Sequence, residues 1–296
     1  MRPDLLLNLR LAICEIVLFS VFVGAVLMGA CALAAYAQSP ESENVQTSFL
    51  GFDRNDYPGD ENLALLRRSF AFTAYWLNVP PGGKVNSWAG RRETIRNAGF
   101  GFLVLFNGKL DAELRKSKDA PAMGRVDSAS AVAAAKKEGF PTQTIIFLDV
   151  EEGGRMLPEQ RAYIYAWVDG VNASGYRAGI YCSGIAAKED GGVEVITAKD
   201  LQQNAAGRNI SFWVANDACP PSPGCVFPKR DPRPSDSGIA FADVWQTAQS
   251  PRRRDIAGGC RATYDRNNNC YAPGTRDRGL FLDIDVAKTQ DPSGGR

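Results

Sequence analysis

The chain has 296 residues, of which 45% are hydrophobic, and its formal net charge at pH 7 is +1. This length can form one large domain or two small ones, and the near-zero charge argues against nucleic acid as a partner. The sequence contains no histidine, which excludes Ser-His-Asp triads, Cys-His dyads and histidine-ligated zinc or haem. Acid–base chemistry near neutral pH must therefore come from carboxylates, Lys, Tyr or Cys.

Residues 1–37 have the features of a targeting segment. Two arginines precede a long apolar stretch, and the Ala-Tyr-Ala sequence at 35–37 predicts signal-peptide cleavage before Gln38. The length of the stretch leaves an uncleaved anchor open, with membrane association through residues 11–37, and Cys31 lies in a weakly lipoprotein-like sequence. Each alternative exports the following domain to the periplasm, the extracellular space or the outer side of a membrane.

A polar linker at 38–47 is followed by a domain expected to span 48–288, in which strand and helix patterns alternate. Eight segments are strand candidates: Ser48–Asp53, Phe72–Leu77, Phe100–Asn107, Thr144–Glu151, Ala178–Ser183, Ser211–Asn216, Asp243–Ala248 and Leu280–Val286. The apolar run within Thr144–Glu151 is of the kind found in strands buried on both faces. Helical patterns follow the first five: Glu61–Ser69, Trp88–Ala98, Asp127–Glu138 with Asp127 as N-cap, Pro158–Ala173 and Thr197–Ala206. Residues 289–296 are expected to form a disordered tail.

This order predicts an α/β fold of the TIM-type (β/α) barrel class, with parallel strands. Five β/α units would be followed by three strands joined by long cysteine-bearing loops at 217–240 and 249–279. An open doubly wound sheet is the alternative, but no glycine-rich phosphate-binding turn follows any of the strands.

The cysteines of the domain predict two disulfides. Cys219 and Cys225 flank one short loop, and Cys260 and Cys270 flank another. Outside the cytoplasm, bridges within each loop, Cys219–Cys225 and Cys260–Cys270, are the expected pairing. Cys182 lies in a strand with no basic neighbour in sequence, so we expect a free, buried thiol.

The strand at Thr144–Glu151 ends in a run of acids. Four apolar residues lead into Asp149-Val150-Glu151-Glu152, and the alternation of side chains places Asp149 and Glu151 on one face. Two carboxylates side by side at a strand end favour a catalytic role. The alternative is a structural pair satisfied by arginine or by backbone amides. Glu152 is expected to be a solvated or salt-bridged neighbour.

Other polar and aromatic residues lie near the ends of the predicted strands. Asp53 ends the first strand, Gln246 lies late in the seventh, and Asp283 and Asp285 share one face of the eighth. Aromatic residues near the same ends include Trp76, Tyr181, Trp213 and Trp245. Carboxylates beside aromatic rings suit a sugar, whose C–H faces stack on rings while its hydroxyls form hydrogen bonds. Asp53 and Asp283 as loop caps, and the two later tryptophans as barrel wall, are the alternatives.

Five fragments, in order, resemble glycoside hydrolase family 25, the lysozyme-like N-acetylmuramidases, and more closely a neighbouring group of bacterial glycoside hydrolase-like domains of unknown function. The fragments are Gly51-Phe52-Asp53, Phe147-Leu148-Asp149-Val150-Glu151, Gly179-Ile180-Tyr181-Cys182-Ser183, Val244-Trp245-Gln246 and Leu282-Asp283-Ile284-Asp285. The resemblance covers residues 48–288, but the two cysteine-bearing loops have no counterpart that we can map onto the muramidases.

The resemblance implies an exported glycosidase that acts on a β-linked, N-acetylated glycan such as peptidoglycan. Glu151 would be the general acid, Asp149 would stabilise the substrate's acetamido group or developing charge, and Asp53 and Asp283 would complete the catalytic acids. Burial and the charge of Asp149 are both expected to raise the pKa of Glu151. The expected substrate-binding residues are Trp76, Tyr181, Trp213, Trp245 and Gln246.

Two non-enzymatic alternatives remain open at this point. One is a catalytically silent glycan-binding module on the same barrel, and the other is an envelope structural protein that binds a partner protein. In every case we expect a monomer with no cofactor and no metal ion.

Overall fold

The computed structural model describes residues 48–296 except 118, 228–231, 257–258 and 261–263. The predicted targeting segment, 1–37, and linker, 38–47, lie outside the described residues. None of the helices described is long and apolar enough to cross a membrane.

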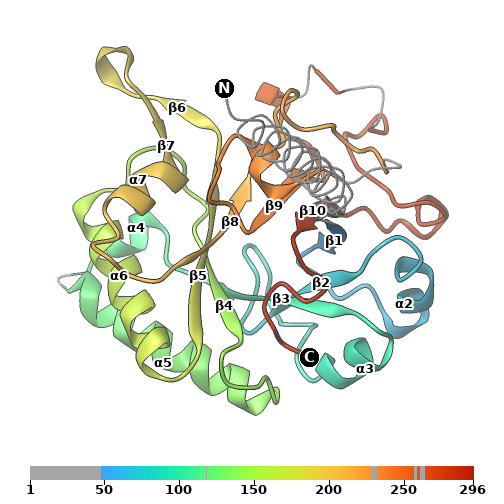
Figure 1. The fold of residues 1–296 in the computed structure, drawn as a ribbon, viewed down its shortest axis with the longest axis horizontal. Coiled ribbons are helices and arrows are strands. Elements are labelled where there is room, and N and C mark those ends of the chain that lie inside the picture. The colour runs from blue at the N-terminus through green and yellow to red at the C-terminus, as the bar shows by residue number, and fades with distance from the viewer. Residues whose placement is uncertain (1–47, 118, 228–231, 257–258, 261–263) are drawn as a thin grey trace, which may run out of the picture. The chain divides into compact units, whose positions relative to one another are not determined.

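Eight strands close into a barrel, as the sequence predicts (Figure 1). In chain order they are β1 (Phe49–Asp53), β2 (Phe72–Trp76), β3 (Gly101–Asn107), β4 (Ile145–Asp149), β5 (Arg177–Ser183), β8 (Ser211–Ala215), β9 (Val244–Ala248) and β10 (Asp283–Ala287). The expected TIM-type barrel is confirmed, and each of the eight expected strands is present.

One strand departs from the expected parallel arrangement. β10 runs antiparallel to both of its neighbours, β9 and β1, whereas β1 to β5, β8 and β9 are parallel. A parallel return needs a long crossover, usually a helix, and among the described residues only loops and short 3₁₀ turns connect β9 to β10. The start of β10 therefore lies at the same barrel end as the finish of β1. We call this end the mouth.

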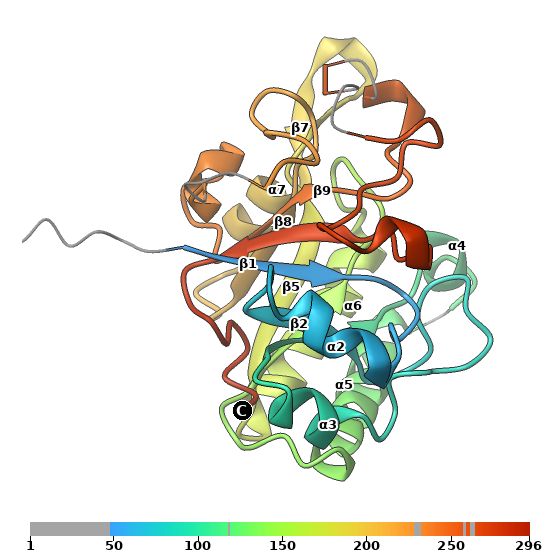
Figure 2. The ribbon, with the colours of Figure 1, turned by 90° about the vertical axis from the view of Figure 1, so that its right-hand side faces the viewer.

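Helices follow the earlier strands and cover the barrel wall (Figures 1 and 2). They are α2 (Asp60–Leu66), α3 (Arg92–Asn97), α4 (Asp111–Leu114), α5 (Ala120–Lys137), α6 (Pro158–Ala173) and α7 (Thr197–Gln203). The predicted start of α5 is wrong, because the helix begins seven residues before Asp127: the carboxylate of Asp119 accepts a hydrogen bond from the backbone N–H of Ala122 at 2.9 Å and caps it. Asp127 instead accepts a hydrogen bond from Tyr163 of α6 at 2.7 Å.

Large rings fill the barrel interior where two glycines leave room for them. A Cβ atom on Gly51 would lie 2.0 Å from the ring of Phe72, and one on Gly179 would lie 2.4 Å from the ring of Phe147. Both distances are far below van der Waals contact, so these positions on β1 and β5 require glycine. The interior below the mouth is therefore a packed core, as in other barrels of this class.

Two segments differ from the sequence expectation. A small hairpin, β6 (Ala186–Lys188) and β7 (Glu194–Ile196), follows β5 and projects from the barrel (Figure 1). Residues 289–296 are ordered against the barrel instead of forming a disordered tail: the hydroxyl of Ser293 accepts a hydrogen bond from the backbone N–H of Val104 at 2.9 Å, and its backbone N–H bonds the carbonyl of Phe102. These contacts cap the end of the barrel opposite the mouth.

The disulfides connect two loops to each other. Cys219 bonds Cys260, and Cys225 bonds Cys270, so each bridge joins the β8–β9 loop to the β9–β10 loop. The expected pairing within each loop is wrong, because the two loops lie side by side, and the first cysteine of one loop bonds the first of the other, as do the second cysteines. Cys182 is free and buried, as predicted.

Candidate active site

Five acids meet at the mouth of the barrel, and we call them the acid cluster: Asp53, Asp149, Glu151, Asp283 and Asp285. Asp53 and Asp149 are the last residues of β1 and β4, and Glu151 lies two residues further on. Because β10 is antiparallel, its first residue, Asp283, pairs directly with Asp53. The cluster therefore combines acids from three strands that are far apart in sequence.

A chain of amide and phenol groups holds Asp53. The hydroxyl of Tyr181 donates a hydrogen bond to Oε1 of Gln246 at 2.7 Å. Nε2 of Gln249 donates to the same oxygen at 2.9 Å and to the hydroxyl of Tyr181 at 3.3 Å. With its oxygen occupied, Gln246 presents Nε2 to the Oδ2 of Asp53 at 2.8 Å. This network fixes the orientation of the amide and, through it, of the carboxylate.

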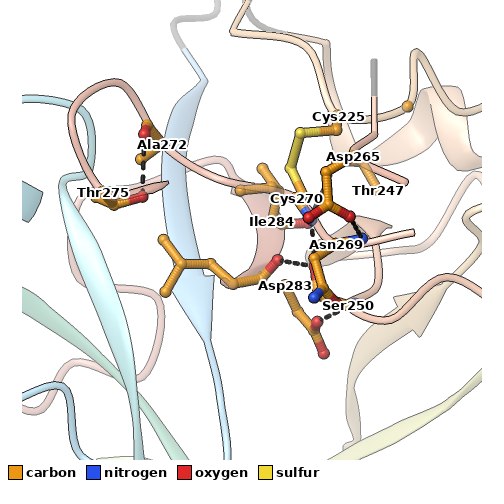
Figure 3. Close-up of a disulfide and its surroundings, with 12 residues drawn as sticks. Cys225, Thr247, Ser250, Asp265, Asn269, Cys270, Ala272, Thr275, Asp283 and Ile284 are labelled. Atoms are coloured by element: carbon orange, nitrogen blue, oxygen red, sulfur yellow. Dashed lines mark hydrogen bonds between the residues drawn. A yellow bond between two sulfur atoms is a disulfide. The ribbon is translucent and has the colours of Figure 1, made fainter. Parts of the chain in front are cut away.

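Asp283 is held by the loop that follows β9 (Figure 3). The backbone N–H of Ser250 donates to Oδ1 of Asp283 at 2.6 Å. The hydroxyl of Ser250 donates to the carbonyl of Leu282 at 2.7 Å and accepts from the backbone N–H of Cys270 at 2.8 Å. Cys270 is bonded in turn to Cys225, so one disulfide lies two hydrogen bonds away from the carboxylate.

Asp285 lies deeper, below Asp53. It is fully buried and pairs with Gly51, which has no side chain to separate it from Asp53 on the same face. Its Oδ1 accepts a hydrogen bond from Nε1 of Trp213 at 3.0 Å. The ring of Trp213 packs between Phe147 and Tyr181, with centroid distances of 5.9 and 4.8 Å.

Burial raises the pKa of each acid in the cluster. The pKa of Asp53 rises to about 6, because desolvation and the charge of Glu151 outweigh the hydrogen bonds from Gln246 and Asp285. Desolvation raises the pKa values of Asp149, Asp283 and Asp285 well above the ordinary range, and neighbouring carboxylates add to the shift. Carboxylic acids that hold protons near neutral pH are what general acid catalysis requires.

The interaction between Asp149 and Glu151 changes the pKa of Glu151 in the opposite direction to our expectation. Burial does raise the pKa of Glu151, although its side chain is exposed to solvent. The hydrogen bond with Asp149, however, lowers the pKa of Glu151 and raises that of Asp149. The expected raising of the pKa of Glu151 by Asp149 is therefore wrong, because a hydrogen bond to a carboxylate stabilises its ionised form.

Similarity to known proteins agrees with this fold. Residues 85–231 match the family model described as "Rv2525c-like, glycoside hydrolase-like domain". The fold is glycoside hydrolase-like. This confirms the resemblance stated from the sequence fragments.

Solved structures with a similar fold come from several bacteria. An uncharacterized protein of B. stearothermophilus is 20% identical, with a TM-score of 0.50 over 80% of this chain and 95% of that chain. The Tat-secreted protein Rv2525c of Mycobacterium tuberculosis, in complex with L-tartrate, is 12% identical, with a TM-score of 0.50 over 84% of this chain and 99% of that chain. A bacterial lysozyme from Streptomyces coelicolor is 15% identical, with a TM-score of 0.42 over 80% of this chain and 90% of that chain. No curated protein matches this chain.

The predicted substrate-binding residues divide into two groups. Gln246, Tyr181 and Trp213 form part of the hydrogen-bonded support of the acid cluster. Trp245 lies on the opposite face of β9 from Gln246 and donates its Nε1–H to the carbonyl of Asn216, so the fold does not bring it to the cluster. Trp76 is buried and donates to the carbonyl of Arg54. All five are at most 9% exposed, which leaves little ring surface for a sugar.

Glu152 lies outside the cluster. Its carboxylate accepts hydrogen bonds from the backbone N–H of Asp111 at 2.9 Å and from Nε2 of Gln160 at 2.8 Å. It therefore links the start of α4 to α6, and its role is structural.

Three residues of the site were absent from the predicted set. The sequence did contain a signal for Asp285, since it lies two residues from Asp283 and shares a face of the strand with it. Gln249 and Ser250 had no such signal, because they lie in a loop and Ser250 acts on Asp283 through its backbone N–H.

Among the described residues, no group of three or more acidic or cysteine side chains has the arrangement of a metal site.

Proposed function

We propose that this protein is a glycosidase that cleaves a β-linked, N-acetylated glycan, with peptidoglycan as the substrate. The observation that carries the proposal is the acid cluster, in which five carboxyl groups with raised pKa values meet at one end of a glycoside hydrolase-like barrel. Burying several acids together is costly, and catalytic sites are where this cost is commonly accepted.

Glu151 is the proposed general acid. It is the one exposed member of the cluster, so a glycosidic oxygen can reach it, and burial raises its pKa above the ordinary value of a glutamate. Asp149 lies beneath it, holds a proton more firmly and is hydrogen-bonded to it. When Glu151 gives its proton to the leaving oxygen, the proton of Asp149 stabilises the new carboxylate.

Asp53 is the proposed anionic partner. Its pKa is about 6, so it is mostly ionised near neutral pH, and the hydrogen bond that Gln246 donates to it favours the ionised form. An ionised carboxylate here can stabilise the positive charge that develops on the sugar ring in the transition state. Asp283, paired with Asp53 across the strands, completes the acidic surface.

Export is part of the proposal. Two disulfides are typical of proteins that fold outside the cytoplasm. The apolar, arginine-preceded segment at 1–37 supplies a signal for that export.

The test is release of reducing ends from purified peptidoglycan, measured from about pH 4 to about pH 8, by the wild type and by Glu151→Gln. Loss of the proton donor should lower turnover by roughly 10²-fold or more and leave glycan binding near that of the wild type. Glu152→Gln is the matched control, since the same chemical change is made one residue away, outside the cluster. Equal turnover in wild type and Glu151→Gln would remove Glu151 as the acid. Saturable binding without turnover in either would favour the silent glycan-binding module.

A further inference from the structure

Asp285 is a buried acid that the proposed reaction does not use. It has no solvent-exposed surface, and Trp213 donates to its Oδ1 at 3.0 Å. Its other oxygen, Oδ2, is also buried, and no N–H or hydroxyl group of the described residues donates to it. Asp53 lies on the same face of the neighbouring strand β1 and interacts electrostatically with Asp285.

Only one protonation state satisfies this arrangement. If Asp285 were ionised, two carboxylates would face each other away from water, and Oδ2 would be left without a hydrogen bond. If Oδ2 carries a proton, it can donate to Asp53, and the charge is confined to the residue nearer the mouth. Trp213 Nε1 can only donate, so it marks Oδ1 as the acceptor and leaves Oδ2 to hold the proton.

Other charged and titratable groups also act on this pair. They are Asp283 on β10, Asp149 and Glu151 at the end of β4, Tyr181 on β5 and, acting through its charge on Asp283, Arg54. The hydroxyl of Tyr181 is already committed to Gln246. Asp53 therefore has one side-chain amide donor, Gln246, and faces Asp285, which can donate to it only when protonated.

We propose that Asp285 is a positioning residue that works as a neutral hydrogen-bond donor beneath Asp53 and keeps that carboxylate oriented and ionised. The inference rests on the proposed function for its effect on catalysis, but the protonation of the two acids can be measured without any substrate. The pKa directions agree, since the hydrogen bond between the pair lowers the pKa of Asp53 and raises that of Asp285.

Two substitutions separate a neutral donor from a charged group. Asp285→Asn keeps the shape, lets an amide N–H replace the carboxylic acid as donor to Asp53, and keeps an oxygen for Trp213. Asp285→Leu fills a similar volume but removes the donor. We expect Asp285→Asn to leave the pKa of Asp53 within about half a unit of the wild type, and Asp285→Leu to raise it by about one unit or more.

The measurement is a ¹³C-carboxyl NMR titration of aspartate-labelled protein, with the Asp53 signal assigned by its absence in Asp53→Asn. In the wild type, the Asp285 signal should stay in the protonated range up to about pH 7. On peptidoglycan, the acid limb of the pH profile should move upward in Asp285→Leu and stay in place in Asp285→Asn.

The outcomes decide the proposal even if Asp285→Leu does not fold. An Asp285 signal that titrates with ordinary acidity in the wild type overturns it. So does an Asp285→Asn variant that shifts the pKa of Asp53 by a unit, or that loses turnover as fully as Asp53→Asn, because both results require a charged Asp285. Absence of turnover in the wild type would overturn the proposed function and leave the NMR result to decide the role of Asp285.

Discussion

The two halves of the barrel are built differently and contribute differently to the acid cluster. Strands β2 to β5 are backed by helices, and their longest pair, α5 and α6, packs closely. Strands β8 to β10 are joined by loops tied together by two disulfides. The helical half supplies Asp149 and Glu151, and the loop half supplies Asp283, Asp285 and the groups that orient Asp53. We infer that the packed helices of the first half stabilise the domain without orienting Asp53 or Asp283, whereas the loops of the second half both stabilise the domain and hold these two acids in place.

The largest effect is expected where the two halves meet, at Asp53 of β1. Asp53→Asn preserves the shape of the side chain but removes the anion that would stabilise the transition state. We expect turnover on peptidoglycan to fall by about 10²-fold or more, while the thermal unfolding temperature stays within a few degrees of that of the wild type.

The matched control is Asp56→Asn, an exposed aspartate three residues further along the same chain segment. It should leave turnover unchanged. Equal losses of turnover and thermal stability in Asp53→Asn would instead make Asp53 a structural cap, as the alternative interpretation of the sequence holds.

The second effect tests whether the loop half controls the site. Cys225→Ala with Cys270→Ala opens a bridge across 45 residues of sequence, which typically costs about 2–4 kcal/mol of unfolding free energy. Because the backbone N–H of Cys270 holds the hydroxyl of Ser250, which lies against Asp283, turnover should also fall several-fold. Urea unfolding and peptidoglycan turnover measure the two effects separately.

The second disulfide provides the control. Cys219→Ala with Cys260→Ala opens a bridge across 41 residues and should lower stability by a similar amount. We expect a smaller loss of turnover, since the hydrogen bonds that connect a disulfide to Asp283 run through Ser250 and Cys270, which belongs to the other bridge. If both pairs lower turnover equally, the loops act on the site as one unit and the path through Ser250 has no special role.

The disulfides also show where the sequence stops predicting the structure. The strands were predictable because each is a short segment rich in β-branched, aromatic or alternating apolar residues. Helix α6 has the predicted bounds of Pro158–Ala173 because proline and amphipathic periodicity mark it. Disulfide pairing depends on which loops lie side by side, and sequence spacing contains no such information. The antiparallel direction of β10 was missed for the same reason, since it depends on how the chain returns to the barrel.

The candidate site was also only partly predictable from the sequence. Strand alternation correctly places Asp149 with Glu151, and Asp283 with Asp285, on shared faces. It cannot show which acid of each pair holds the proton, because that depends on burial and on donors such as Trp213 from another strand. The position of Ser250 could not be predicted either, since a backbone N–H is present at every residue except proline.

The third effect is a pH dependence of stability that Asp53 creates. Its pKa is raised in the folded state, from 3.8 to about 6, so folding favours the protonated form. The resulting stabilisation is complete below about pH 4 and is lost as the pH rises through about 6. A shift of about two units corresponds to about 3 kcal/mol of unfolding free energy.

This contribution is measured as the difference between the wild type and Asp53→Asn in urea unfolding at about pH 4 and about pH 8. The wild type should lose stability relative to the variant as the pH rises. Asp190→Asn, on the exposed turn of the β6–β7 hairpin, should show no such difference. A wild type that gains stability relative to Asp53→Asn would mean that Asp53 is ionised and stabilised in the fold, contrary to its burial.

The smallest effect on the site is expected from the helical half. A Cβ atom on Gly124 of α5 would lie 2.3 Å from the backbone carbonyl oxygen of Tyr163 on α6. Alanine gains about 1 kcal/mol of helix propensity over glycine, but the clash is with backbone, which no rotamer change can relieve, and overpacking costs about 1–3 kcal/mol. Gly124→Ala should therefore lower the unfolding free energy by about 1–2 kcal/mol, because the two helices must move apart.

Turnover per folded molecule and its pH profile should match those of the wild type, since neither Gly124 nor Tyr163 belongs to the acid cluster. A Gly124→Ala protein with wild-type stability but reduced turnover would reverse the assignment of roles to the two halves.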